Sequence, residues 1–282
     1  MRDFGQDHSA LALNTASLGH NLDGAGAGWS SEQLIDACAE RGFGGIVYWR
    51  RELGDRAQQI GERTRAAGLA VAGLCRTPLM VGPGTPQPLE DEVRASIDMA
   101  AALGAPVLTI VTGGTEPGTK GLGPSWDLLA ERVAVACDHA ARQGVKLALE
   151  PLNPMFGGNR TCLFTVADAY EICRRVNHPA LGIAVDVYHV WWDSRLTESL
   201  AAAKGLILGY HLCDWLAETS HMLLDRGMMG DGVADLRAIR AAVEAAGYAG
   251  FCEVEIFSAE DWWKRDPREV LDTMVDRFRR FC

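Results

Sequence analysis

The feature that most constrains the fold is an eightfold alternation of short apolar segments with longer amphipathic segments along the chain. The short segments have the length of buried strands, whereas the longer ones carry apolar residues at helical spacing and often end in glycine. We expect strands at residues 11–18, 45–50, 69–75, 106–112, 146–152, 181–189, 206–213 and 251–257. Eight such repeats without a compositional break predict a single (β/α)8 TIM barrel domain over residues 1–282.

An open, doubly wound sheet is the alternative architecture, because GAGAG at residues 24–28 resembles its dinucleotide-binding fingerprint. These glycines, however, follow the first predicted strand only after several residues. The second predicted strand ends in Arg50 and Arg51 before Glu52, which is not the acidic ending expected of a ribose-binding strand. We therefore interpret the glycine-rich segment as a loop of the barrel.

Charge and composition exclude several classes of function. The chain has 27 Lys and Arg against 37 Asp and Glu, a formal net charge of −10, so it would repel nucleic acid and anionic membranes. No apolar run reaches the roughly 18 residues that cross a membrane, and the first residues lack the apolar stretch of a secretory signal. Eight scattered cysteines without a CxxC pair indicate buried free thiols, which predicts a cytoplasmic protein.

Two carboxylates interrupt the last predicted strand, FCEVEIF at residues 251–257. Because side chains alternate between the two faces of a strand, Glu253 and Glu255 point to the same side. An unpaired carboxylate in a protein interior costs several kcal/mol or more, so something must hold both of them. For Glu253 the sequence leaves open a place beside a metal site, a protonated carboxyl group or a buried ion pair.

Three other predicted strands carry a polar residue at the equivalent carboxyl end, namely Glu150, Asp186 and His211. The C-terminal ends of barrel strands form one rim, where the active sites of such barrels lie. We therefore expect these three residues and Glu255 to meet and to bind one divalent cation. Carboxylate oxygens and imidazole nitrogens suit Mn²⁺, Mg²⁺, Co²⁺ or Zn²⁺, and of these we expect Mn²⁺.

The motifs around these residues carry a family resemblance. LALEPLNP, AVDVYHVWWD, GYHLCDW and RGMMGDG, followed by EVEIF, together resemble the sugar phosphate isomerase/epimerase family of xylose isomerase-like TIM barrels. That family includes ketose 3-epimerases and dehydroshikimate dehydratases, and the resemblance spans essentially the whole chain. By residue, it implies metal ligands at Glu150, Asp186, His211 and Glu255 and substrate contacts at His189 and Arg226. The second metal ion and catalytic lysine of xylose isomerase itself have no counterpart cluster here.

The resemblance implies proton transfer beside the carbonyl group of a keto-sugar or sugar derivative. In a metal-dependent isomerase or epimerase, Glu150 and Glu255 would remove and return a proton, and the cation would stabilise the enediolate. The alternative on the same scaffold is a lyase or dehydratase acting on a keto-sugar or keto-cyclitol. In that reaction His189 would protonate the leaving group. The resemblance is broadest to the isomerases and epimerases, which favours the first reaction.

Two further functions fit the sequence less well. A phosphodiester hydrolase like the endonuclease of this fold needs a histidine-rich zinc cluster and a basic surface, but the chain has seven histidines, mostly away from the rim. A sugar-binding protein without activity would not need the complete set of ligands. We therefore expect a small-molecule sugar substrate, with neither nucleic acid nor a membrane as a partner.

Tryptophan pairs occur at two places. Trp191 and Trp192 follow His189, where either ordinary packing or a wall that stacks on a sugar ring would account for them. Trp262 and Trp263 lie near the C-terminus, and exposed aromatic side chains there would mark a subunit contact. Together with the habit of the family, they predict a homo-oligomer, either a dimer or a tetramer.

Overall fold

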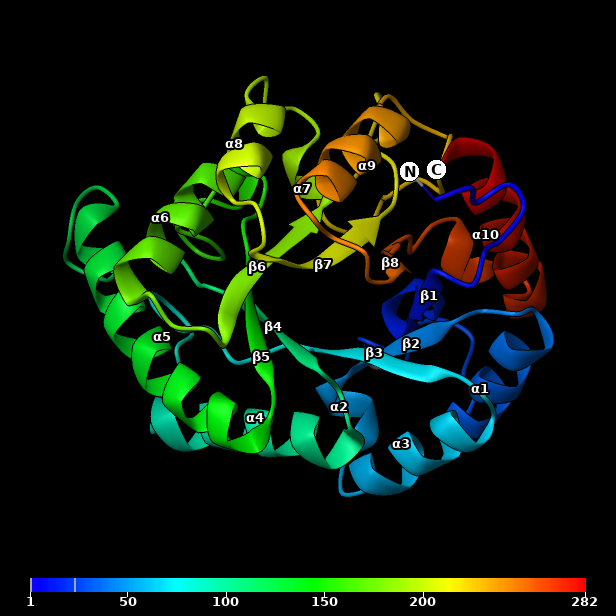
Figure 1. Ribbon diagram of the computed structural model, residues 1–282, viewed down its shortest axis with the longest axis horizontal. Helices are drawn as coiled ribbons and strands as arrows, with labels where there is room; N and C mark the ends of the chain where they lie inside the picture. The colour runs from blue at the N-terminus through cyan, green and yellow to red at the C-terminus, as the bar shows by residue number, and fades with distance from the viewer. Residues whose placement is uncertain (1, 23) are drawn as a thin grey trace.

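Eight parallel strands form a closed barrel in the computed structural model, which describes residues 2–22 and 24–282 (Figure 1). Neighbouring strands pair in chain order, and β1 also pairs with β8, which closes the ring. The strands are β1 (Leu11–Asn14), β2 (Gly45–Trp49), β3 (Ala70–Cys75), β4 (Val107–Val111), β5 (Lys146–Glu150), β6 (Leu181–Asp186), β7 (Ile207–Leu212) and β8 (Cys252–Val254). The predicted (β/α)8 TIM barrel is confirmed.

Helices surround the barrel on its outside (Figure 1). Their ends follow local rules: α1 begins at a capping box between Ser30 and Gln33, and α4 and α5 end at Gly104 and Gly144 in the left-handed conformation. The helices are α1 (Ser31–Glu40), α2 (Arg50–Leu53), α3 (Ala57–Ala66), α4 (Leu89–Leu103), α5 (Gly123–Gln143), α6 (Val166–Val176), α7 (Val187–Val190), α8 (Leu196–Ala202), α9 (Leu236–Ala245) and α10 (Pro267–Phe281), with 3-10 turns η1 (Thr15–Leu18), η2 (Pro154–Phe156) and η3 (Trp262–Lys264).

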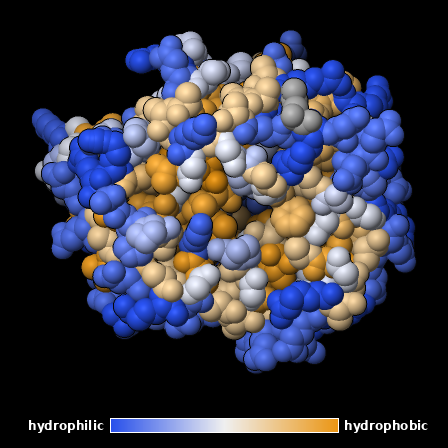
Figure 2. Space-filling view, in the orientation of Figure 1, coloured by the Kyte–Doolittle hydropathy of each residue, from blue (hydrophilic) through white to orange (hydrophobic). Residues whose placement is uncertain are grey.

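The hydrophobic core lies between the barrel and its helices. Leu11 and Leu13 of β1 and Leu147 and Leu149 of β5 are fully buried in it. The alternating residues of each strand point into the barrel, where small side chains such as Ala148 fit. Figure 2 shows hydrophilic side chains over the outer parts of one face and hydrophobic side chains gathered around a central hollow.

Three strands, β1, β6 and β8, end at least three residues earlier than predicted, and in two of them a polar side chain starts a helical turn. Asn14 ends β1, because its Oδ1 accepts a hydrogen bond from Ala16 N and η1 begins there. Asp186 ends β6 in the same way through Tyr188 N, so His189 lies on the short helix α7 and not on the strand. The last strand ends at Val254, which leaves Glu255 just beyond it.

The predicted free thiols are confirmed, because all eight cysteines are buried and unpaired. Within the described ranges, no helix is long and apolar enough to cross a membrane. Trp262 and Trp263, however, are not the exposed aromatic residues that the sequence suggested. They are only 5% and 8% exposed, and Trp263 Nε1 donates to the carbonyl oxygen of Ala16. The structure therefore removes this argument for a subunit contact.

Candidate metal centre and active site

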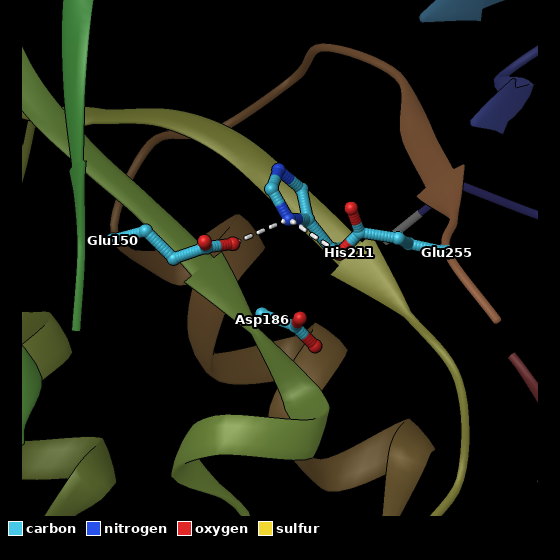
Figure 3. A group of neighbouring side chains, drawn as sticks. All are labelled: Glu150, Asp186, His211 and Glu255. Atoms are coloured by element: carbon cyan, nitrogen blue, oxygen red, sulfur yellow. Dashed lines mark ion pairs between the residues drawn. The ribbon is translucent and has the colours of Figure 1, made fainter. Parts of the chain in front are cut away.

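Four polar side chains meet at the carboxyl ends of the last four strands. Glu150 ends β5, Asp186 ends β6, His211 lies near the end of β7 and Glu255 follows β8. One ligand atom from each lies within 4.8 Å of the others, and all four residues are buried. In Figure 3, Glu150 and Glu255 approach His211 from opposite sides, with Asp186 across from the ring. The structure thus brings together the four residues that the sequence predicted to meet.

Two atoms of this group are suited to bind a cation because they have no hydrogen-bond partner. His211 Nδ1 lies 3.0 Å from Glu150 Oε1 and 3.7 Å from Glu255 Oε2. Nevertheless, neither His211 Nδ1 nor Glu150 Oε1 forms a hydrogen bond among the residues described, although both atoms are buried. Buried polar atoms are nearly always satisfied, so both are free to bind a metal ion. An imidazole nitrogen with three carboxylates is a donor set that divalent cations accept.

The electrostatics of the group show an excess of negative charge. Burial raises the pKa of Glu255 well above its usual value, and Glu150 and Asp186 add to this against Arg226 and His211. Burial opposes the charged form of His211, but Glu253 and Glu150 outweigh it and raise the pKa of His211 well above its usual value. In the absence of a metal ion these groups therefore retain protons. A divalent cation bound to these groups would supply the positive charge that the retained protons supply in its absence.

Arg226 is a buried cation between two of the predicted metal ligands. Its Nη1 donates to Asp186 Oδ2 at 2.8 Å and to Glu255 Oε2 at 3.3 Å. Its guanidinium group lies between the rings of Tyr188 and Phe257, 4.4 Å from each centroid. Burial alone would raise the pKa of Asp186, but Arg226 outweighs it and keeps that carboxylate ionised. Arg226 thus positions the acids as well as lining the pocket beside them.

His189 is held in one tautomer by a backbone contact. Asn153 N donates to His189 Nδ1 at 3.2 Å, so the neutral ring carries its proton on Nε2. That Nε2 lies 3.7 Å from Asp186 Oδ2. Burial, together with Arg226 and against the attraction of Asp186, lowers the pKa of His189 to about 4. His189 is therefore a neutral hydrogen-bond donor in the pocket.

Glu253 faces Nε2 of His211, whereas Glu150 and Glu255 lie nearer to Nδ1 of that ring. Its Oε2 is 3.4 Å from His211 Nε2, and its Oε1 accepts a hydrogen bond of 2.6 Å from Asn14 Nδ2. The same Asn14 amide donates to Glu255 Oε1 at 2.9 Å. Asn14 is a site residue that sequence reasoning missed, although its place at the inward end of the first strand was a usable signal. Glu253 thus faces the ring nitrogen that points away from Glu150.

A second group, Cys75 with Glu253 and Glu255, also brings three potential ligand atoms close together. The Asn14 amide already satisfies one oxygen of each carboxylate. Burial, with the nearby glutamates, raises the pKa of Cys75 well above its usual value, so this residue remains a thiol. Because the thiolate is the form that binds metals, this group is a poorer metal site than the first one.

The pocket over the metal centre has walls that the sequence did not reveal. Its aromatic lining comes from Trp49, Phe156 and Phe257, and Arg76 and Arg160 also line it. Trp191 and Trp192 do not belong to this lining. Trp191 packs against Trp215, and Trp192 donates from Nε1 to the carbonyl oxygen of His189. Ordinary packing therefore accounts for Trp191, and Trp192, which is 38% exposed, does not form a wall of this pocket.

Comparison with known proteins identifies the family. The sequence profile of the xylose isomerase-like TIM barrel matches residues 35–274, which is most of the chain. The chain belongs to the xylose isomerase-like TIM barrel family. Among its relatives is fructoselysine 3-epimerase from Escherichia coli O157:H7, which is 28% identical over 156 residues, 55% of this chain and 53% of that protein. This member of the family therefore spans about half the length of that curated relative.

Solved structures support the same assignment to the xylose isomerase-like TIM barrels. Protein SMc04130 from Sinorhizobium meliloti 1021 is 40% identical, with a TM-score of 0.89 over 98% of this chain and 99% of that one. The IOLI protein, solved with a bound zinc atom, is 21% identical, with a TM-score of 0.78 over 96% and 99% of the two chains. At that identity the likeness concerns the fold, and it shows that such a barrel can hold a metal ion.

Proposed function

We propose that this chain is a divalent-metal-dependent isomerase or epimerase that acts on a keto-sugar or sugar derivative. The observation that carries the proposal is the arrangement of Glu150 and Glu255, which face each other across His211 and Asp186 (Figure 3). The relationship to fructoselysine 3-epimerase supports the class of reaction. These four residues would hold the cation, for which Mn²⁺ is our first choice and Mg²⁺, Co²⁺ or Zn²⁺ are alternatives.

When bound, a divalent cation would polarise a carbonyl oxygen and so acidify the neighbouring C–H group. The protein supplies the proton transfer. One of Glu150 and Glu255 removes the proton, and the other returns a proton from the opposite side. Return to the same carbon inverts its configuration, as in an epimerase, whereas return to the adjacent carbon gives an isomerase. Both residues are buried, so the proton is exchanged with little access to bulk water.

His189 and Arg226 orient the substrate in this proposal. The Nε2–H of His189 is available to a substrate oxygen, because Nδ1 is occupied by the N–H of Asn153. Arg226 is fixed by Asp186 and Glu255, and its Nη2 lies 3.4 Å from His189 Nε2. Two hydrogen-bond donors therefore converge beside the carboxylates. A fixed pair of donors suits the binding of sugar oxygens during proton transfer.

Proton exchange in D₂O tests the proposal directly. Metal-loaded protein is incubated with a panel of keto-sugars, and incorporation of deuterium beside the carbonyl group is measured by NMR. We expect exchange with at least one substrate and a loss of about 10²–10⁴-fold in Glu150→Gln and in Glu255→Gln. Glu131→Gln, a change to an exposed acid on α5, is the matched control. Loss of a substrate hydroxyl group would instead identify the lyase, and unchanged exchange in both variants would refute the two-glutamate mechanism.

A further inference from the structure

Two arginines line the pocket without a carboxylate partner. Arg76 follows the last residue of β3, and Arg160 lies in the loop after β5, so two separate parts of the barrel rim supply them. In the ranges 2–22 and 24–282, neither guanidinium group forms an ion pair with an acid. Most arginines on the outer helices do form such pairs, for example Arg94 with Glu90. What distinguishes these two arginines is their place in the pocket beside the candidate metal ligands.

The donors of these two arginines are largely unused. Arg76 Nη1 donates to the carbonyl oxygen of Thr77 at 3.1 Å, which occupies one of the five N–H donors of the group. The side chain of Arg160 makes no hydrogen bond within the described part of the chain, although its backbone is fixed by Gly113 and Phe156. Each guanidinium group thus retains a free edge. A free planar edge is the geometry that binds a carboxylate or a phosphate through two parallel hydrogen bonds.

The positive charge is concentrated on one side of the pocket. The pKa of Arg76 is lowered, first by burial and then by repulsion from Arg160, with a further contribution from Arg50, whereas Cys75 and Glu150 act in the opposite direction. Arg50 lies next to Arg76, because its Nη1 donates to the carbonyl oxygen of Arg76 at 3.4 Å, and it also pairs with Glu92. Repulsion between Arg76 and Arg160 outweighs the attraction of Glu150, and an anion bound between the two arginines would relieve it. The molecule as a whole carries a net charge of −10, so this positive wall is a local exception.

The acids of the metal centre do not explain the two arginines. Glu150, Asp186, Glu253 and Glu255 already have Arg226 and the predicted cation to balance most of their charge. A neutral sugar, bound through its hydroxyl groups and carbonyl oxygen, needs no additional cation. Arg76 is half-buried and Arg160 is exposed to solvent, and no acid among the described residues pairs with either of them. The missing negative charge is one that the substrate can supply.

We propose that Arg76 and Arg160 bind an anionic group of the substrate, so that the chain acts on an acidic keto-sugar derivative, carrying a carboxylate or a phosphate, in preference to a neutral sugar. This inference rests on the proposed isomerase or epimerase function and specifies its substrate class. The anionic group lies at the side of the pocket formed after β3 and β5. The reacting carbons lie over Glu150 and Glu255, next to this side of the pocket.

Matched substrate pairs test this assignment. Ribulose and ribulose 5-phosphate differ by a phosphate, and fructose and fructuronate differ by a carboxylate, so the two pairs distinguish the two kinds of anion. With the metal-loaded full chain, we expect kcat/KM for deuterium exchange to be at least about 100-fold higher for one of the acidic members. Arg76→Met and Arg160→Met should each lower that value by about 10- to 100-fold. Arg142→Met, an exposed arginine on α5, is the matched control.

Direct binding separates this inference from the proposed function. Inorganic phosphate and glycolate are titrated into the metal-loaded chain, and the fluorescence of Trp49 in the pocket wall reports binding. Binding that weakens by 10-fold or more in Arg76→Met and Arg160→Met supports the anion site even if no keto-sugar exchanges protons. Neutral sugars that exchange as fast as their acidic partners would overturn it, as would anion binding that is unchanged in both variants.

Discussion

Replacing Glu253 by glutamine should weaken metal binding without removing a ligand. Glu253 Oε2 lies 3.4 Å from His211 Nε2, and its Oε1 accepts from Asn14. Glutamine has one acceptor oxygen in place of two, so it can satisfy Asn14 or His211 but not both. The ring then loses the acceptor that keeps its proton on Nε2 and its Nδ1 available to the cation.

The expected loss of Mn²⁺ affinity in this variant depends on the charge state of His211. Full opposite charges 3.4 Å apart would attract by about 5 kcal/mol at an effective dielectric constant of roughly 20. A metal-bound imidazole is neutral, however, so only the hydrogen bond and the orientation of the ring remain. Partners of this kind typically contribute 10- to 100-fold to metal affinity, which is about 1.4–2.8 kcal/mol. We expect Glu253→Gln to weaken Mn²⁺ binding by that factor.

Calorimetric titration of the metal-free chain with Mn²⁺ measures the effect, and thermal unfolding of the metal-free proteins shows whether folding has changed. Glu131→Gln removes one exposed negative charge and is the matched control. An affinity within about twofold of the wild type would show that Glu253 does not orient His211. Complete loss of binding, as expected for removal of a ligand, would mean that Glu253 itself binds the metal ion.

Four further predictions concern the same site and the assembly of the protein. A Glu255→Gln, His211→Ala double variant should contain almost no metal by elemental analysis, and full retention would contradict the predicted ligand set. Because the pKa of His211 is raised, metal binding should release about one proton from it and strengthen as pH rises, which calorimetry in buffers of different ionisation enthalpy detects. His189→Asn should lower turnover but leave proton exchange measurable, whereas loss of exchange with metal still bound would make His189 the base. Light scattering at micromolar concentration should show a homo-oligomer, and a monomer mass would reject that expectation.

The meeting of the four candidate metal ligands could be predicted from the sequence because it depends on regular geometry. Strand alternation decides which side of each strand Glu150, Asp186 and His211 occupy, and the barrel places the ends of all strands at one rim. Strand alternation and the common rim of the barrel both hold whatever the conformation of the loops. Even Glu255, which lies just past the observed end of β8, keeps the direction that alternation gives it.

The remaining features of the site depend on loops and on packing between distant segments. Arg160 reaches the pocket because its loop is fixed by Gly113 and Phe156, which no periodic pattern encodes. Trp191 was equally compatible with packing and with a sugar-stacking wall, and the contact with Trp215 that decides between them lies far along the sequence. The conformation of the loops, which depends on many weak contacts, is therefore the part of the site that could not be predicted from the sequence.

The hydrogen bonds of Asn14 have a consequence for how the protein is made. Asn14 is synthesised long before the carboxylates that it holds, Glu253 and Glu255, which lie 239 and 241 residues later. Strands β1 and β8, at whose ends these residues lie, are also the two that close the ring. On the ribosome, the nascent chain therefore cannot complete the candidate metal centre until its eighth strand has been translated. Acquisition of the metal ion would accordingly be among the last events in the maturation of the protein, after the final strand has docked against the first.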